Sequence, residues 1–312
     1  MTRVLSLLIL LSFGFSSQAQ RYKKPEQYFR EFQTQKRRIN KKNLMYLKAS
    51  LRGDDERRVA KYREMMVEQL KDSKADLSRI GDYEGYDILQ REFVDALTMY
   101  IHAYETDFGI AEELTESRYN SYEDLKKYYD AVTKAEGEML DASYKMEKAE
   151  DHFAKMHFFT IDRDEEIEEE YRLLDEVTLY TRDMTLSFYR VEQHSKDFLK
   201  AINDGNTDTL DDILGYMQKD IKVSMAEIEE YEDFEGQKDL YKEVEYFLEE
   251  MSVEANENLR ELSNMLENKY LEDKEYKKAQ KELDKFISRH NDYLDNFFET
   301  KSDLILDYLP ED

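Results

Sequence analysis

The chain has 312 residues, of which 40% are hydrophobic and 38% are charged, and its formal net charge is −26 at pH 7. It contains no cysteine, which excludes disulfide bonds, thiolate metal sites and a cysteine nucleophile. So acidic a chain repels nucleic acid and anionic lipid as a whole, and we expect no nucleic-acid partner. The two prolines and nine glycines are few for this length, which is typical of long helices.

Residues 1–19 have the three-part organisation of a secretory signal peptide. Arg3 supplies a short positive region, residues 4–15 form an apolar run, and residues 17–19 (Ser-Gln-Ala) are small enough to precede a cleavage site. The apolar run is shorter than the roughly 20 residues that a membrane anchor needs. We therefore predict cleavage after Ala19 and export to the periplasm, the cell surface or the medium, with no transmembrane anchor.

Basic residues are concentrated near the predicted mature N-terminus. Residues 20–63 contain fifteen Lys/Arg and five Asp/Glu, whereas the residues that follow contain thirty and sixty-seven. The basic side chains either pair with acidic helices of the same molecule, which we favour, or form a surface patch for an anionic envelope polymer or an acidic partner. The candidate patch consists of Lys36, Arg37, Arg38, Lys41, Lys42, Arg57, Arg58 and Lys61.

Apolar residues recur at alternating steps of three and four, which is the spacing of a stripe along a helix. The longest stripe, from Leu125 to Met156, predicts a helix of about 32 residues with buried alanines along one line. Further stripes cover residues 174–202, 210–228, 240–255 and 276–297. No stretch has the alternation of a β-strand. The predicted fold class is therefore all-α, with long antiparallel helices in up-and-down bundle units.

Two short stretches, IGDYEG at 80–85 and YEDFEG at 231–236, lie 151 residues apart. An ungapped comparison of residues 75–127 with 226–278 at this shift gives eleven identical positions. We predict an internal duplication into helical repeat units 20–160 and 161–312. The alternatives left open are that the two helical runs are unrelated, and that the units form one elongated bundle.

In this interpretation each stretch is the turn between the second and third helices of its unit. Gly85 and Gly236 permit the turn, and the aromatic residue two positions before each glycine closes the end of the bundle. The aspartates before the aromatic residues are predicted to cap the next helix. The remaining residues of these structural turns are Asp82, Tyr83, Asp233 and Phe234.

No known catalytic or metal motif is present in the sequence. None of the five histidines follows a Glu at the spacing of a di-iron site, and there is no zinc-protease or haem-attachment motif. His290 lies on an apolar stripe, where a hydrogen-bonded core histidine is expected. We therefore predict no catalytic residue, no cofactor and no metal, and we disfavour an enzyme that uses carboxylates and tyrosines in a bundle cleft.

Several segments resemble an uncharacterised family of exported helical bacterial surface proteins. The resemblance rests on Tyr46, a glycine turn followed by Arg57 and Arg58, the aromatic-Glu-Gly turn at residues 83–85, and Phe188 with Tyr189. Asp54 and Asp55, just after the first glycine, depart from the pattern and dilute its basic turn. The resemblance implies export and a role at the bacterial surface or envelope, and it supplies no catalytic residues.

These features together predict a non-enzymatic exported envelope or surface protein. It would act through helix-mediated protein contacts, with a protein partner or by self-association. The alternative is a binding module for an anionic envelope ligand, carried by the basic N-terminal helices.

Overall fold

The computed structural model describes residues 22–52, 55–163, 165–231, 233–267 and 272–310, and the predicted signal peptide lies outside them. Within these ranges the chain is helical and contains no β-strand, which confirms the predicted fold class. None of the described helices has an apolar stretch sufficient to cross a lipid bilayer.

The helices pack into two compact units. Within the described residues, unit 1 consists of residues 22–50, 55–110 and 131–163, and unit 2 of residues 51–52, 111–130, 165–231, 233–267 and 272–310. The predicted division at residue 160 lies close to the end of unit 1, while residues 111–130 pack with unit 2. The internal duplication stays a prediction.

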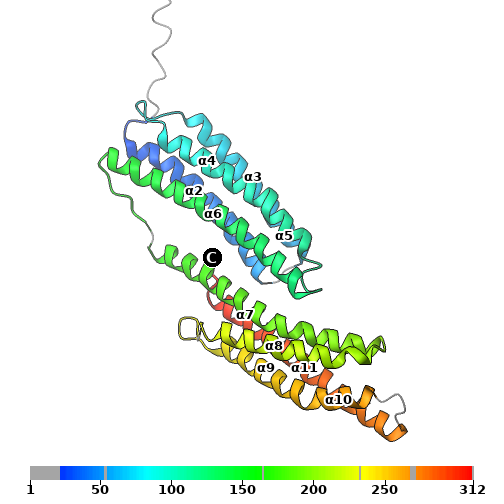
Figure 1. Cartoon of the computed structure of the whole chain (residues 1–312). Coiled ribbons are helices and arrows are strands. Elements are labelled where there is room, and N and C mark those ends of the chain that lie inside the picture. The colour runs from blue at the N-terminus through cyan, green and yellow to red at the C-terminus, as the bar shows by residue number, and fades with distance from the viewer. Residues whose placement is uncertain (1–21, 53–54, 164, 232, 268–271, 311–312) are drawn as a thin grey trace, which may run out of the picture. The chain divides into compact units, whose positions relative to one another are not determined.

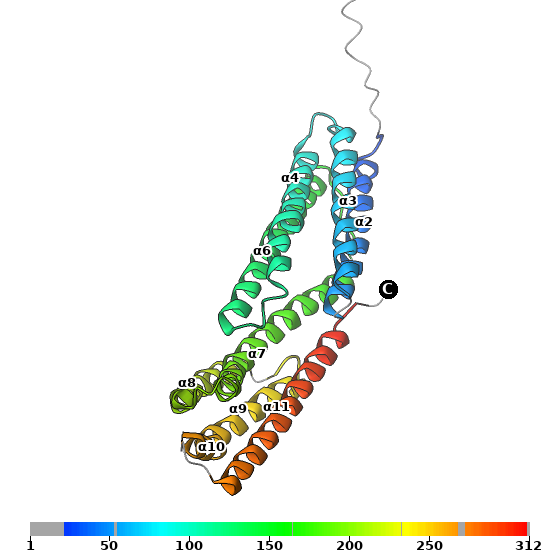
Figure 2. The ribbon, with the colours of Figure 1, turned by 90° about the vertical axis from the view of Figure 1, so that its right-hand side faces the viewer.

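Unit 1 is a bundle whose helices run side by side (Figures 1 and 2). Its core is aromatic, and the rings of Tyr28 and Phe93 each lie within about 5 Å of Phe32, at 5.1 and 5.0 Å. Phe153 contributes a fourth fully buried ring. The elements are α2 (Pro25–Leu51), α3 (Glu56–Ile80), α4 (Ile88–His102), the π-helical turn η1 (Ala103–Asp107), α5 (Phe108–Leu114) and α6 (Tyr122–Met156), of which α5 and α6 each extend into unit 2.

Unit 2 has a core built around a stack of three phenylalanines. The ring of Phe188 lies 4.1 Å from that of Phe247 and 4.1 Å from that of Phe297, nearly parallel to the latter at 10°. Stacked rings of this kind bury a large apolar area. The elements are α7 (Glu165–Asn203), the 3-10 turn η2 (Thr207–Thr209), α8 (Leu210–Ile228), α9 (Asp239–Asn256), α10 (Asn258–Glu267) and α11 (Asp273–Asp307).

Every predicted apolar stripe lies on a helix of the structure. The longest is on α6, where Ala135, Ala142 and Ala149 are all buried. Small side chains at seven-residue intervals let a neighbouring helix approach closely. The stripe predictions for α7, α8, α9 and α11 are likewise confirmed.

The two glycine-containing stretches have the same backbone conformation. Glu84 and Gly85 have φ of 54° and 83°, and Glu235 and Gly236 have φ of 50° and 83°. Each pair is bracketed by reciprocal backbone hydrogen bonds, which join Tyr83 to Tyr86 and Phe234 to Gln237. Two successive residues at positive φ define a type I′ turn, and the glycine occupies the position that disfavours a side chain.

The aromatic residues of these turns are buried as predicted, but the aspartates do not cap the next helices. Tyr83 and Phe234 are 4% and 8% exposed. Asp82 Oδ1 accepts a hydrogen bond from the Gly85 amide at 2.7 Å, and Asp233 Oδ1 accepts one from Gly236 at 2.9 Å. The amide inside each turn is nearer than the helix start, so the aspartates stabilise the turn itself. The N-cap positions of α4 and α9 are Asp87 and Lys238, neither of which makes a side-chain cap bond.

Candidate functional site

The middle of α2 presents most of the predicted basic patch. Residues 32–53 contain seven Lys/Arg and no Asp/Glu. Arg37, Arg38 and Lys41 are exposed on α2, and Lys42 is half-buried. Among the described residues, Arg38, Lys41 and Lys42 form no ion pair, so their charges face solvent.

The start of α3 adds further positive charge in the same unit. Arg57, Arg58 and Lys61 are exposed there. The guanidinium of Arg58 lies 5.7 Å from the centre of the Tyr62 ring, an arrangement that holds this side chain along the helix surface. Six of the eight predicted patch residues are thus exposed, three on α2 and three on the first turns of α3.

Lys36 differs from the other patch residues because it has a structural role. Its Nζ lies 3.3 Å from Oε2 of Glu150, a carboxylate only 1% exposed on α6, and Gln33 Nε2 donates to Oε1 of the same group at 2.8 Å. Burial raises the pKa of Glu150 above its usual value, although the charge of Lys36 opposes this rise. The internal pairing that we favoured from the sequence is therefore found at Lys36.

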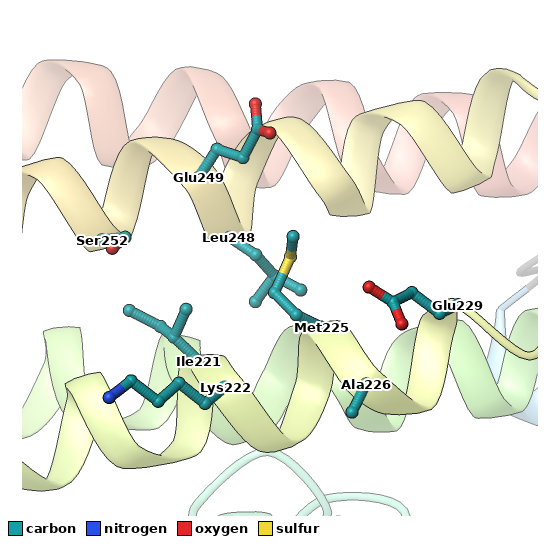
Figure 3. A pocket seen from close by; sticks show the side chains of 8 residues that line it. All are labelled: Ile221, Lys222, Met225, Ala226, Glu229, Leu248, Glu249 and Ser252. Carbon is teal, nitrogen blue, oxygen red and sulfur yellow. The ribbon is translucent and has the colours of Figure 1, made fainter.

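Unit 2 contains a shallow groove of about 450 Å³ between α8 and α9. Ile221, Met225 and Leu248 project into the space between the helices (Figure 3). The carboxylates of Glu229 and Glu249 stand apart along its rim. Its lining is thus an apolar seam without a convergent set of polar groups, which a catalytic cleft needs.

A buried polar cluster lies in the core of unit 2. Glu192, which is 0% exposed on α7, has Lys196 Nζ at 3.2 Å and His290 Nε2 at 3.7 Å. Burial raises the pKa of Glu192 to about 6 and lowers that of His290 to about 4. His290 is a core residue as predicted, but its Nε2 makes no hydrogen bond to a described residue, because 3.7 Å is too long.

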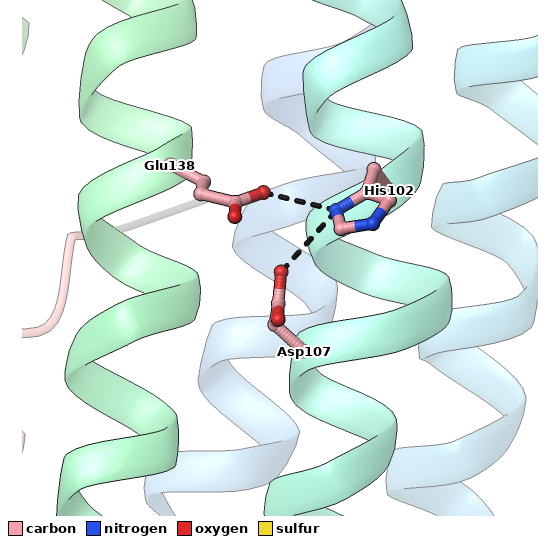
Figure 4. A group of neighbouring side chains, drawn as sticks. All are labelled: His102, Asp107 and Glu138. Carbon is pink, nitrogen blue, oxygen red and sulfur yellow. Dashed lines mark hydrogen bonds and ion pairs between the residues drawn. The ribbon is translucent and has the colours of Figure 1, made fainter.

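Three potential metal ligands meet in unit 1, where α4 passes into η1 beside α6. His102 Nδ1 lies 3.0 Å from Oε2 of Glu138 and 3.4 Å from Oδ2 of Asp107 (Figure 4). The ligand atoms of all three residues lie within 4.8 Å of one another.

The π-helical turn η1 explains why His102 and Asp107 face each other. In a regular α-helix, residues five apart point about 140° away from each other. In η1 the Phe108 amide bonds to the Ala103 carbonyl, five residues back, so the turn holds one more residue. Asp107 is thereby brought beneath His102, as a residue four positions away would be in an α-helix.

Asp107 is an anion held inside the protein. Its side chain is 1% exposed, and its Oδ1 accepts a hydrogen bond from Lys134 Nζ at 2.6 Å. Burial alone would raise the pKa of Asp107, but the bond and the charge of Lys134 hold it below its usual value. The other oxygen, Oδ2, is buried and makes no hydrogen bond to a described residue.

Sequence reasoning missed this group of ligands. Metal motifs on helices place their ligands at spacings of three and four, whereas His102 and Asp107 are five apart. The third ligand, Glu138, lies on another helix, and one carboxylate among many gives no signal of its own. A search for His and Asp at a five-residue spacing would have found the pair, but only η1 makes that spacing meaningful.

Comparisons with known proteins add no functional assignment. No family model, curated protein or solved structure matches this chain.

Proposed function

We propose that this chain is a non-enzymatic exported protein that binds an anionic polymer of the bacterial envelope through the basic surface on α2 and α3. Export is supported by the signal-peptide organisation of residues 1–19 and by the family resemblance. The observation that carries the binding role is the stretch from residue 32 to residue 53, which has seven basic residues and no carboxylate in an otherwise acidic chain.

The layout of these charges suits a polymer better than a small anion. Arg37, Arg38 and Lys41 are exposed within about 6 Å of rise along α2, and Lys61 adds an exposed cation on α3. A row of separate cations can neutralise successive charges of an extended chain, whereas one small anion would contact only one or two of them. The acidic remainder of the protein would confine such a polymer to this surface by repulsion.

A binding assay over a range of salt concentrations tests the proposal. The probes are polyphosphate and polygalacturonate, with uncharged dextran as the negative control. The triple substitution Arg37→Gln, Arg38→Gln and Lys41→Gln should weaken binding and reduce the dependence of log Kd on log salt. The slope should fall by roughly 0.7–0.9 for each polymer charge that is no longer neutralised, if the polymer behaves as nucleic acid does.

A matched control changes the same net charge elsewhere. Lys219, Lys222 and Lys242 are exposed lysines of unit 2, and their triple replacement by Gln should leave the affinity nearly unchanged. Equal loss of binding in both triple variants would show a general charge effect and contradict the proposed surface. No binding of either probe at low salt would contradict the function.

Protein contacts, the function predicted first from the sequence, remain a second candidate with an observation of their own. Leu140 and Tyr144 lie one turn apart on α6 and are 69% and 56% exposed, so an apolar strip faces solvent. Light scattering should then give a mass that rises with protein concentration, and Leu140→Ser should abolish this rise. A concentration-independent monomer mass would exclude self-association through the strip.

A further inference from the structure

We infer that His102, Asp107 and Glu138 bind a divalent transition-metal cation, for which Zn²⁺ is the best fit. The donor set is one imidazole nitrogen and two carboxylate oxygens. Imidazole suits Zn²⁺ and its neighbours in the first transition row, whereas Mg²⁺ and Ca²⁺ prefer oxygen ligands throughout. Three protein ligands would leave one coordination position for water, as in zinc sites that are not purely structural.

The separations of His102 Nδ1 from the two carboxylate oxygens are close to those of a tetrahedral site. Bonds of 2.0–2.2 Å to a central ion place neighbouring ligand atoms about 3.4 Å apart. His102 Nδ1 already lies 3.4 Å from Oδ2 of Asp107 and 3.0 Å from Oε2 of Glu138. An ion could therefore be held with small side-chain adjustments and no movement of the helices.

The buried oxygen of Asp107 is an independent sign of a ligand. Oδ2 is directed toward His102, is excluded from solvent, and makes no hydrogen bond to a described residue (Figure 4). A buried carboxylate oxygen without a hydrogen bond destabilises a protein, so such groups are rare unless something else satisfies them. A cation between Oδ2 and the two other ligands would satisfy it.

Access and local charge are both compatible with an ion. The side chain of His102 is 55% exposed and that of Glu138 is 32% exposed, so the site opens to solvent on one side. Lys134 is the competing charge, because its ammonium already bonds Oδ1 of Asp107. Its side chain is 61% exposed and can turn outward, and Oδ2, which faces His102 Nδ1 at 3.4 Å, is not bonded to Lys134.

Unit 2 has no counterpart of this site at the equivalent positions. The shift of 151 residues places Val253, Asn258 and Arg289 where unit 1 has His102, Asp107 and Glu138. There the guanidinium of Arg289 pairs with Glu254, so a positively charged side chain of the protein itself lies at the aligned position. The binding chemistry is thus specific to unit 1 within the described residues.

The test is a titration of the mature protein with Zn²⁺ in competition with a chromophoric chelator. We expect one saturable site, and at least a tenfold loss of affinity in His102→Gln and in Glu138→Gln. The matched control is His194→Gln, since His194 Nε2 also contacts a carboxylate, Asp220 at 2.8 Å, but has no third ligand. This variant should bind Zn²⁺ as the parent does.

Lys134→Gln supplies a test in the opposite direction. Removal of the competing ammonium should raise the affinity for Zn²⁺ several-fold, an effect that general disturbance of the fold cannot produce. Absence of a saturable site, unchanged affinity in His102→Gln, or equal loss in His194→Gln would each overturn the inference.

Discussion

In both units the third helix is interrupted, at positions that the shift of 151 residues aligns, but the two interruptions differ in structure. In unit 1 the extra residue is absorbed in η1, so the helix continues from α4 into α5. In unit 2 the helix ends at Asn256, Glu257 departs from regular helical dihedral angles with φ of −118° and ψ of −78°, and α10 begins at Asn258. The shift of 151 residues places Thr106 of η1 opposite Glu257.

The difference shows how two similar helical frameworks acquire different chemistry. An absorbed residue turns Asp107 inward toward His102 and Glu138. In unit 2, Asn258, which the shift aligns with Asp107, is exposed, and the buried carboxylate near the break is Glu254, which pairs with Arg289. π-helical turns are often found at functional sites for this reason, since they re-aim a side chain.

The largest effect on stability is expected at the ion pair of unit 2. Arg289→Met leaves Glu254, which is 4% exposed on its side chain, without its cation. Because an unpaired buried charge is costly, we expect the free energy of unfolding to fall by about 3 kcal/mol. Urea denaturation measures the change, and Zn²⁺ should not reverse it. A loss below about 0.5 kcal/mol would show that the stability of unit 2 does not depend on this ion pair.

The corresponding change in unit 1 should be smaller and reversible by metal. Lys134→Gln removes the cation that contacts buried Asp107, so the metal-free protein should be less stable. A bound ion supplies the missing charge and stabilises the folded state by mass action. Thermal unfolding with and without Zn²⁺ should show recovery for this variant alone. If Zn²⁺ also restored the thermal stability of Arg289→Met, the interrupted helices of the two units would not be chemically distinct.

The buried carboxylates of the two units should respond differently to neutralisation. Glu192 pairs with Lys196 at 3.2 Å, but the effect of burial is larger and raises the pKa of Glu192 to about 6. A folded pKa above the usual 4.5 means that protonation favours folding: this contribution is present below pH 4.5 and is lost as the pH rises through 6. Glu192→Gln, which mimics the protonated form, should therefore add about 2 kcal/mol at pH 7.5 and little at pH 4.

Two features sharpen this pH test. The pKa of His290 is lowered to about 4, so its neutral form stabilises the fold above pH 6.5 and that contribution is lost as the pH falls toward 4. The two residues thus oppose each other on acidification. Glu150→Gln in unit 1 should gain less, because Glu150 accepts a hydrogen bond from Gln33 in addition to its ion pair with Lys36, whereas Glu192 has the ion pair with Lys196. Destabilisation of Glu192→Gln at pH 7.5 would contradict the assignment.

The smallest effects are expected at the two turns, and they should be equal. Gly85→Ala and Gly236→Ala each place a side chain at φ of 83°, which costs about 1 kcal/mol. A Cβ at either position meets no atom within 4 Å, so the cost comes from the backbone alone. Urea denaturation of the two variants should give the same loss, and a difference above about 1 kcal/mol would show that the turns are not equivalent.

Much of the fold could be predicted from the sequence, because it depends on local patterns. The stripe from Leu125 to Met156 specified α6, and the glycine-containing stretches specified turns with buried aromatic residues. The roles of Asp82 and Asp233 were mispredicted, since a type I′ turn offers its own amide before the next helix does.

The candidate sites were harder to predict because they depend on distant partners. The contact of Lys36 with Glu150 spans 114 residues, and no local pattern distinguishes Lys36 from the exposed lysines beside it. The group around His102 depends on η1, a departure from the regular period that apolar spacing does not reveal. Its third ligand is one carboxylate among 72 Asp/Glu residues.

Histidine side-chain NMR of the mature protein during addition of Zn²⁺ tests most directly whether the metal binds beside η1 in unit 1 and not at the histidines of unit 2. The protein has five histidines, so the ring signals can be assigned one by one by substitution. The signals of His102 should shift and saturate at one equivalent, while those of His194 and His290 in unit 2 stay in place. Shifts of His194 that accompany or precede those of His102 would contradict the account.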